Sequence, residues 1–457
     1  MMSRKFQWLC LTLLGVVAIT ALPALAEQPP PAAAAKAQPV AATQADITQV
    51  NVAINTVWIV VAAALVFFMQ AGFGMVEAGF LRAKNTCNIL MKNFVDYCSA
   101  SLMFYVVGYS LMFGGGNGFL GWEGFGIDWA AGTDPSGAGV SHHAYWFFQA
   151  AFCGAAATIV AGGMAGRMKF GAYLMYTVVI SALIYPIVGH WIWGGGWLAK
   201  MDFSDFAGST VVHATGGIAA LIGTILLGAR HGKYNGKAKA IPGHNIPIAS
   251  LGVFILWFGW FGFNAGSQIA VGNGMTVAKI AMNTNIAACC GALAAMLTIW
   301  KIGGKPDLSM TMNGALAGLV AITAGCDCMS SVGAMITGTV GGVAVVLSAL
   351  LLERLRIDDP VGAFPVHGIN GIWGTLAIGL FSESSGLFYG HGASQLGIQA
   401  LGVFSVVGFV LLTMGAVFLL IKKTYGLRVS KQEELRGLDI GEHGMESYAG
   451  FQIFTTE

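Results

Sequence analysis

Eleven apolar runs, each close to the length that crosses a bilayer, constrain this chain more than any other feature. An α-helix needs about 20 mostly apolar residues to span the hydrocarbon layer. Only 10% of the 457 residues are charged, against about 25% in soluble domains. The sequence therefore predicts an all-α polytopic membrane protein with eleven transmembrane helices. The runs cover residues 52–81, 89–113, 144–166, 171–193, 207–229, 247–268, 278–300, 309–327, 331–352, 360–381 and 395–421.

The segment before the first run has the pattern of a secretory leader. Residues 1–26 combine a positive start, a short apolar stretch and an A-x-A site, which predicts a cleavable signal peptide; the alternative is an extra first helix. Residues 27–50 are rich in Pro, Ala and Gln, and we expect a disordered extracytoplasmic segment. Residues 51–425 form the expected transmembrane domain, and residues 426–457 a cytoplasmic tail.

Charges in the loops predict the orientation. Alternate loops are basic, beginning with Arg82 and Lys84 and ending with the tail from Lys422. The positive-inside rule then places the mature N-terminus outside and the C-terminus in the cytoplasm. With a signal peptide, this predicts a multi-pass protein of a bacterial cell (inner) membrane. The net charge of +2 gives no indication of a nucleic-acid partner.

A motif occurs twice, once in each half of the chain. Residues 205–218 and 359–372 both read D-x2-G-x3-V-H-x3-G-I. The two copies lie on spans five apart, which cross the membrane in opposite directions. That arrangement predicts two five-helix inverted-topology repeats plus an eleventh helix, with a site near the midplane at their interface.

The polar residues of the motif are assigned different roles. Asp359 precedes Pro360, as at an ordinary helix start, and we expect it mainly to cap that helix. Asp205 lies on the outer side, where its charge either serves the architecture or favours a cation. His213 and His367 lie in apolar helices, where an unpaired polar group costs a few kcal/mol. Two neutral imidazoles can satisfy each other, so we expect a functional pair.

Aromatic residues cluster near the same depth on other predicted spans. Phe148 and Phe152 are one helical turn apart, so both can face one groove. An aromatic cage with one hydroxyl, Ser267, suits a small cation with N–H donors. A membrane-interface belt of aromatic residues is the alternative for many of them.

At this point several motifs resemble a known family in order along the chain. They are AGFLRAKN (78–85), FQAAF (148–152), WGGG (193–196), DFAGSTVVH (205–213), GWFGFNAGS (259–267), DDPVGAFPVHG (358–368) and GLRV (426–429). The chain closely resembles the ammonium transporter (Amt/Mep/Rh) family, in its bacterial Amt type, from about residue 50 to the end.

The resemblance implies a homotrimer in which each eleven-helix subunit has its own pore, and a cytoplasmic face that binds a PII-type signal protein. It implies an external recruitment site made of Trp193, Ser267, Phe148 and Asp205. It further implies a stacked gate, Phe152 and Phe263, and a pore pair, His213 and His367. The implied substrates are ammonium or ammonia and methylammonium, with lipid around the protein, no cofactor and no enzymatic activity.

Three alternatives stay open from the sequence. Paired transmembrane histidines also serve as haem ligands. An ammonium sensor would signal through the tail, and a carrier for another small neutral solute would use the same dry pore.

Glu77 is a separate case: it lies five residues before Arg82, so we expect a structural ion pair, with a functional role as the alternative.

Overall fold

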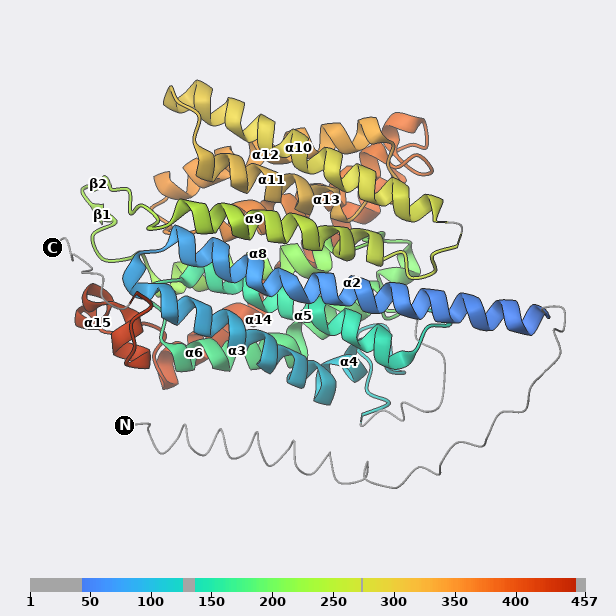
Figure 1. Ribbon diagram of the computed structural model, residues 1–457, viewed down its shortest axis with the longest axis horizontal. Helices are drawn as coiled ribbons and strands as arrows, with labels where there is room; N and C mark the ends of the chain where they lie inside the picture. The colour runs from blue at the N-terminus through green and yellow to red at the C-terminus, as the bar shows by residue number, and fades with distance from the viewer. Residues whose placement is uncertain (1–42, 126–135, 273, 449–457) are drawn as a thin grey trace.

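The computed structural model describes residues 43–125, 136–272 and 274–448, and these form a bundle of long, roughly aligned helices (Figure 1). The α-helices are α2 (Gln44–Phe80), α3 (Thr86–Met103), α4 (Tyr109–Phe113), α5 (His142–Met164), α6 (Phe170–Val179), α7 (Tyr185–Ile192), α8 (Thr215–Leu227), α9 (Ile246–Trp260), α10 (Met275–Gly303), α11 (Leu308–Thr323), α12 (Ser331–Arg354), α13 (Asn370–Phe381), α14 (Ser394–Thr424) and α15 (Lys431–Arg436). The signal peptide predicted at 1–26 lies outside the described residues.

Single π-helical turns interrupt or extend many of these helices. They are η3 (Phe104–Gly108), η4 (Ile180–Ile184), η6 (Ser209–Ala214), η7 (Phe261–Ala265), η8 (Phe364–Ile369) and η10 (Asp439–His443). Short 3-10 turns are η2 (Ala83–Asn85), η5 (Ala199–Met201) and η9 (Leu387–Tyr389). Two short antiparallel strands, β1 (Tyr234–Asn235) and β2 (Lys237–Ala238), project from the end of the bundle near α15 (Figure 1). We call this the tail end.

Within the described residues, nine helical runs are long and apolar enough to cross a membrane. This confirms a multi-pass all-helical membrane protein. Two predicted spans are not among the nine. The run Leu308–Thr323 is shorter, with 16 residues, and the helical run that carries His367 starts only at Phe364.

The first helix begins earlier than the sequence predicts. Its start is a capping box, in which the Thr43 hydroxyl accepts from the Asp46 N–H and the Asp46 carboxylate accepts from the Thr43 N–H. Reciprocal bonds of this kind satisfy orphan backbone donors at a helix start. Residues 44–50, which we had assigned to the disordered segment, therefore form the first turns of α2.

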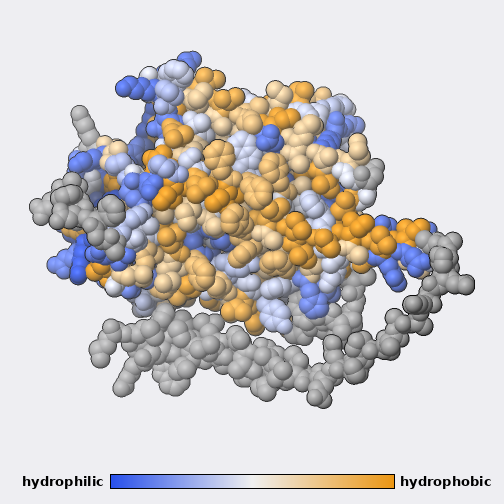
Figure 2. Space-filling model, viewed as in Figure 1, coloured by the Kyte–Doolittle hydropathy of each residue, from blue (hydrophilic) through white to orange (hydrophobic). Residues whose placement is uncertain are grey.

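Small residues let the helices approach closely, as is common in membranes. A Cβ atom on Gly252 of α9 would lie 2.6 Å from the Val76 backbone nitrogen of α2, and one on Gly342 of α12 only 2.1 Å from the Gly291 carbonyl oxygen of α10. The outer surface is apolar across the middle of the bundle and hydrophilic towards its ends (Figure 2). Exposed side chains such as Phe94, Phe254 and Leu412 belong to this apolar surface.

The C-terminal tail folds back onto the chain's own helix ends. The carboxylate of Asp439 accepts from the backbone N–H groups of Cys87, at 3.0 Å, and Asn88, at 2.8 Å, in the first turn of α3. Negative charge is favourable at a helix N-terminus. Arg428 donates to Glu434 at 2.7 Å, within the tail. The tail is thus an ordered part of this end of the molecule up to residue 448.

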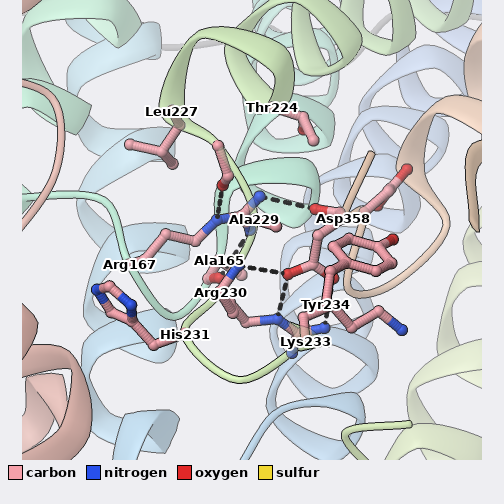
Figure 3. A network of polar contacts seen from close by, with 12 residues as sticks. Ala165, Arg167, Thr224, Leu227, Ala229, Arg230, His231, Lys233, Tyr234 and Asp358 are labelled. Atoms are coloured by element: carbon pink, nitrogen blue, oxygen red, sulfur yellow. Dashed lines mark hydrogen bonds and ion pairs between the residues drawn. The ribbon is translucent and has the colours of Figure 1, made fainter. Parts of the chain in front are cut away.

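A buried ion pair joins loops from the two halves of the chain at the tail end (Figure 3). The Arg230 guanidinium donates to both carboxylate oxygens of Asp358 at 2.8 Å. Arg167 donates to the backbone carbonyl of Asp358 at 2.7 Å and to that of Ala165 at 3.1 Å. Burial alone would raise the pKa of Asp358, but the Arg230 guanidinium outweighs it and holds that pKa well below its usual value.

Candidate functional site

The two aspartates of the repeated motif cap their helices in the same way. The Asp205 carboxylate accepts from the backbone N–H groups of residues 208–211 at 2.8–3.0 Å. The Asp359 carboxylate accepts from those of residues 362–364 at 2.9–3.0 Å. Capping by Asp359 was predicted. For Asp205 the sequence left both an architectural role and a charge that favours a cation open, and in the structure its carboxylate is buried and turned to its own backbone.

Asp205 nevertheless helps to build the Trp193 end of the site. Its backbone carbonyl accepts a hydrogen bond from the Trp193 indole N–H at 2.7 Å, which fixes the orientation of that ring. Trp193 and Ser267 are both half-buried, whereas Phe148 is 1% exposed. The Ser267 hydroxyl donates to the Phe263 carbonyl at 2.9 Å, so its oxygen lone pairs stay available to accept from a ligand.

Below Trp193 the aromatic rings follow one another into the bundle. Phe152 packs against Trp193 with ring centroids 6.1 Å apart and stacks on Phe263 with centroids 4.0 Å apart. Phe148 lies on Phe152 at 4.6 Å. These residues come from α5, the end of α7 and η7, so three parts of the chain meet at the predicted gate.

The histidine pair continues this column of rings. His213, on η6, stacks below Phe263 with centroids 5.3 Å apart, and its Nδ1 lies 3.2 Å from Nδ1 of His367, on η8. One nitrogen must donate and the other accept, so one proton is shared between the rings. The structure thus places the two imidazoles within hydrogen-bonding distance of each other.

His213 has a second nitrogen without a partner. The side chain is fully buried, and Nε2 makes no hydrogen bond to any described residue. Buried polar atoms nearly always have a partner, so an orphan of this kind points to water or a ligand.

Two residues of the column were not selected as site residues from the sequence. Trp260 stacks on His213 with centroids 5.1 Å apart, and its N–H donates to the Thr323 hydroxyl at 2.9 Å. Phe73, on α2, lies on the other side, 6.0 Å from His367 between centroids. The Trp260 ring was visible in an aromatic cluster, but Phe73 has no local signal because its role depends on the packing of α2.

Glu77 does not form the expected ion pair with Arg82. The carboxylate is 2% exposed and accepts from the Asn93 side-chain N–H on α3 at 2.8 Å. Arg82 lies beyond the end of α2, and its Nε and one terminal nitrogen have no described partner. The chain turns at Leu81, which carries Arg82 away from the helix face that bears Glu77. The predicted ion pair between Glu77 and Arg82 is therefore wrong.

Known proteins match most of the chain. The sequence model of the Ammonium Transporter Family matches residues 57–448. Ammonium transporter Amt2 of Archaeoglobus fulgidus is 45% identical over 432 residues, covering 88% of this chain and 90% of that protein. The chain belongs to the ammonium transporter family.

Other proteins of this family also match most of the chain. A putative ammonium transporter of Synechocystis sp. is 48% identical over 407 residues, covering 87% of this chain and 90% of that protein. A solved structure titled "Sensor Amt Protein" has a TM-score of 0.82 and 39% identity, covering 86% of this chain and 99% of that one. Candida albicans Mep2 has a TM-score of 0.78 and 29% identity, covering 83% and 87%. Membership supports ammonium as the substrate.

Proposed function

We propose that this member of the ammonium transporter family recruits ammonium at the Trp193 end, removes one proton and conducts ammonia past Phe152 and Phe263 to the histidine pair. The observation that carries the proposal is the unbroken column of rings that ends on the unpartnered Nε2 of His213. A column without formal charges suits a neutral solute with both N–H groups and a lone pair.

Energetics favours ammonia over the intact ion. Moving a small ion from water into a medium of low dielectric costs on the order of 20 kcal/mol in the idealised limit. A cation–π contact returns about 2 kcal/mol. With the lysine ammonium, pKa about 10.4, as a stand-in, removing a proton at pH 7 costs roughly 4.6 kcal/mol. Potassium binds aromatic rings too, but it has no proton to lose.

The recruitment site is proposed to use Trp193 and Phe148 as ring faces and the Ser267 oxygen as an acceptor. Asp205 contributes by holding the Trp193 ring through its carbonyl and by the negative charge of its buried carboxylate. Methylammonium, which keeps N–H donors and adds one methyl group, is expected to bind as a poorer substrate.

The finer architecture is also proposed. Eleven helices span a bacterial inner membrane, arranged as two inverted five-helix repeats and a final helix, and three such subunits assemble with one pore each. The tail end faces the cytoplasm, after removal of a signal peptide. Its packed tail and the loop that carries β1 and β2 form the face to which a PII-type protein would bind.

Growth of an ammonium-uptake-deficient strain on low ammonium tests the function. We expect the wild-type chain to restore growth. In reconstituted liposomes, His213→Ala should lose ammonium flux by a factor of about 100 or lose its selectivity against potassium, because the imidazole that receives the proton is removed. Wild-type flux and selectivity in the variant would contradict a central role for the pair.

A sensor is the second candidate, since one similar structure carries that word in its title. It predicts ammonium binding without flux in the same liposomes. Haem binding by the pair is disfavoured by geometry. A metal ion between two imidazole nitrogens needs about 2 Å on each side, and Nδ1 to Nδ1 is 3.2 Å.

A further inference from the structure

Below the histidine pair, on the side away from the gate, lies a small cavity. Its volume is about 20 Å³, and its lining includes His367, Phe73, Glu77 and Asn313. About 10–15 Å³ of such space is enough for one water molecule. The cavity therefore has room for a single molecule of the size of water or ammonia, in contact with both an imidazole and a carboxyl group.

The imidazole presents its free nitrogen on this side. Nδ1 of His367 faces His213, so Nε2, across the ring, is directed away from that partner. A proton that enters the pair at Nε2 of His213 must leave at Nε2 of His367, because the two Nδ1 atoms share one proton between them. The pair needs an acceptor beyond His367.

Glu77 is the carboxyl group in this cavity. Its Oε2 accepts from the Asn93 amide at 2.8 Å, and its Oε1 would lie 3.4 Å from a Cβ atom placed on Gly162. A methyl carbon of Val361 would lie only 2.5 Å from the same Cβ atom, so the absent side chain at Gly162 lets Val361 pack close to that oxygen. A buried carboxyl within a transmembrane helix is a candidate for proton transfer by default.

Asn313 links the cavity to the tail end. Its side-chain oxygen is buried and has no hydrogen-bond partner among the described residues, while its N–H donates to the Val361 carbonyl at 3.2 Å. Asn313 also lines a larger cavity of about 250 Å³, together with Phe80, Pro242 and Asp359. The orphan oxygen marks a place where a molecule with an N–H or O–H group is held between the two spaces.

We propose that Glu77 receives the proton that leaves His367, through one water molecule held in the cavity by Asn313. This rests on the proposed function. The proton removed from ammonium enters at His213, and His367 passes one proton to the water while the water passes one to the Glu77 carboxylate. The resulting carboxylic acid releases the proton to a water molecule at Asn313, from which it passes to water in the larger cavity, because Asn313 lines both cavities and Glu77 lines only the small one. Ammonia leaves separately and takes up a proton in the cytoplasm, so each ammonium moves one positive charge.

The charged groups that act on Glu77 come from two neighbouring elements. Lys92 and Asp96 belong to α3, and Asp359 belongs to the loop before η8. Asp96 provides a matched control. It is a fully buried carboxylate on a transmembrane helix, but it accepts from the Thr158 and Thr177 hydroxyls and does not line the small cavity.

The test compares wild type, Glu77→Gln and Asp96→Asn, all full-length and reconstituted in liposomes. Ammonium-jump currents and the internal pH are recorded against empty liposomes. Wild type is expected to give a current with little internal alkalinisation. Glu77→Gln should lose the current at least about tenfold while ammonia entry continues and alkalinises the interior. Asp96→Asn, if it folds, should resemble wild type.

Three outcomes separate the hypotheses. A Glu77→Gln current above half of the wild-type value would overturn the relay. A wild-type protein that conducts ammonia without current would also overturn it, but would leave the proposed function intact. A wild-type protein with neither flux nor current would refute the proposed function itself.

A second variant keeps the test valid if Glu77→Gln does not fold. Asn313→Leu is close in size and leaves Glu77 in place, but it removes the polar atom that holds the water. The relay predicts at least a roughly tenfold loss of current here too. A current above half of the wild-type value in Asn313→Leu would overturn the proposal.

Discussion

At the residue scale, the two copies of the repeated motif form more similar hydrogen bonds than their sequences indicate. The flanking residues differ, with Phe206 after one aspartate and Pro360 after the other, and we had given the two acids different roles. Both carboxylates bind the backbone N–H groups that follow them. The aspartate therefore sets where each histidine-bearing helix begins, and so the depth of each imidazole.

The caps can be tested by Asp205→Asn and Asp359→Asn. Each substitution turns an N–H group towards backbone donors, so we expect each to lower the free energy of unfolding by about 1–2 kcal/mol. Thermal unfolding in detergent measures this, with the exposed Asp202→Asn as control. If Asp205→Asn kept wild-type stability but lost ammonium binding, its carboxylate would be a ligand rather than a cap.

At the element scale, the pore depends on how closely two helical runs cross. A Cβ atom on Gly217 of α8 would lie 2.1 Å from the Gly368 backbone nitrogen of η8, and one on Gly371 of α13 would lie 2.7 Å from the Ala214 nitrogen. These glycines lie four residues after His213 and His367, respectively. Backbone contact here brings the imidazoles within hydrogen-bonding distance.

Gly217→Ala tests this crossing. The added methyl group has no space, so the helices must separate, at a cost of typically 1–3 kcal/mol, and the imidazoles separate with them. We expect a lower melting temperature together with a loss of ammonium flux. The control is Gly408→Ala on α14, where a Cβ atom would meet nothing within 4 Å. Unchanged ammonium flux in Gly217→Ala would show that the distance between the two imidazoles is not critical for transport.

At the scale of the whole molecule, the two halves are held together at the tail end as well as in the membrane. Arg230 follows α8, Asp358 precedes η8, and the ion pair between them is buried. Removing one partner of a buried pair leaves an uncompensated charge, which typically costs 3–5 kcal/mol. This pair therefore fixes the relative position of the two histidine-bearing helices from outside the membrane.

The pair makes stability depend on pH in a defined direction. Because the folded-state pKa of Asp358 lies below its unfolded value, the pair stabilises fully above about pH 4, and the contribution is lost as the pH falls towards the folded-state pKa. Asp358→Asn should lower the melting temperature strongly at pH 7, and the difference from wild type should shrink progressively below pH 4. A difference that stays constant from pH 7 to pH 3 would contradict this.

Much of the site was predictable because its signals are local. The two motif copies, the phenylalanines one turn apart and the capping position of Asp359 can each be read from a few neighbouring residues. In the structure the two Nδ1 atoms lie 3.2 Å apart, the Phe148 and Phe152 ring centroids 4.6 Å apart, and the Asp359 carboxylate accepts from its own backbone. Glu77 was misjudged for the same reason. Its nearest charge in sequence is Arg82, but its partner Asn93 lies on the next helix.

By itself the sequence determined that this chain is a multi-pass helical membrane protein of the ammonium transporter family, because hydropathy and motifs are properties of continuous segments. Only the tertiary structure decided what surrounds each polar group inside it. His213 and His367 are 154 positions apart, and the cavity that joins His367 to Glu77 and Asn313 is lined by residues of α2, α5, α9, α11 and η8. Such contacts depend on fractions of an ångström at helix crossings, and no local pattern encodes those distances.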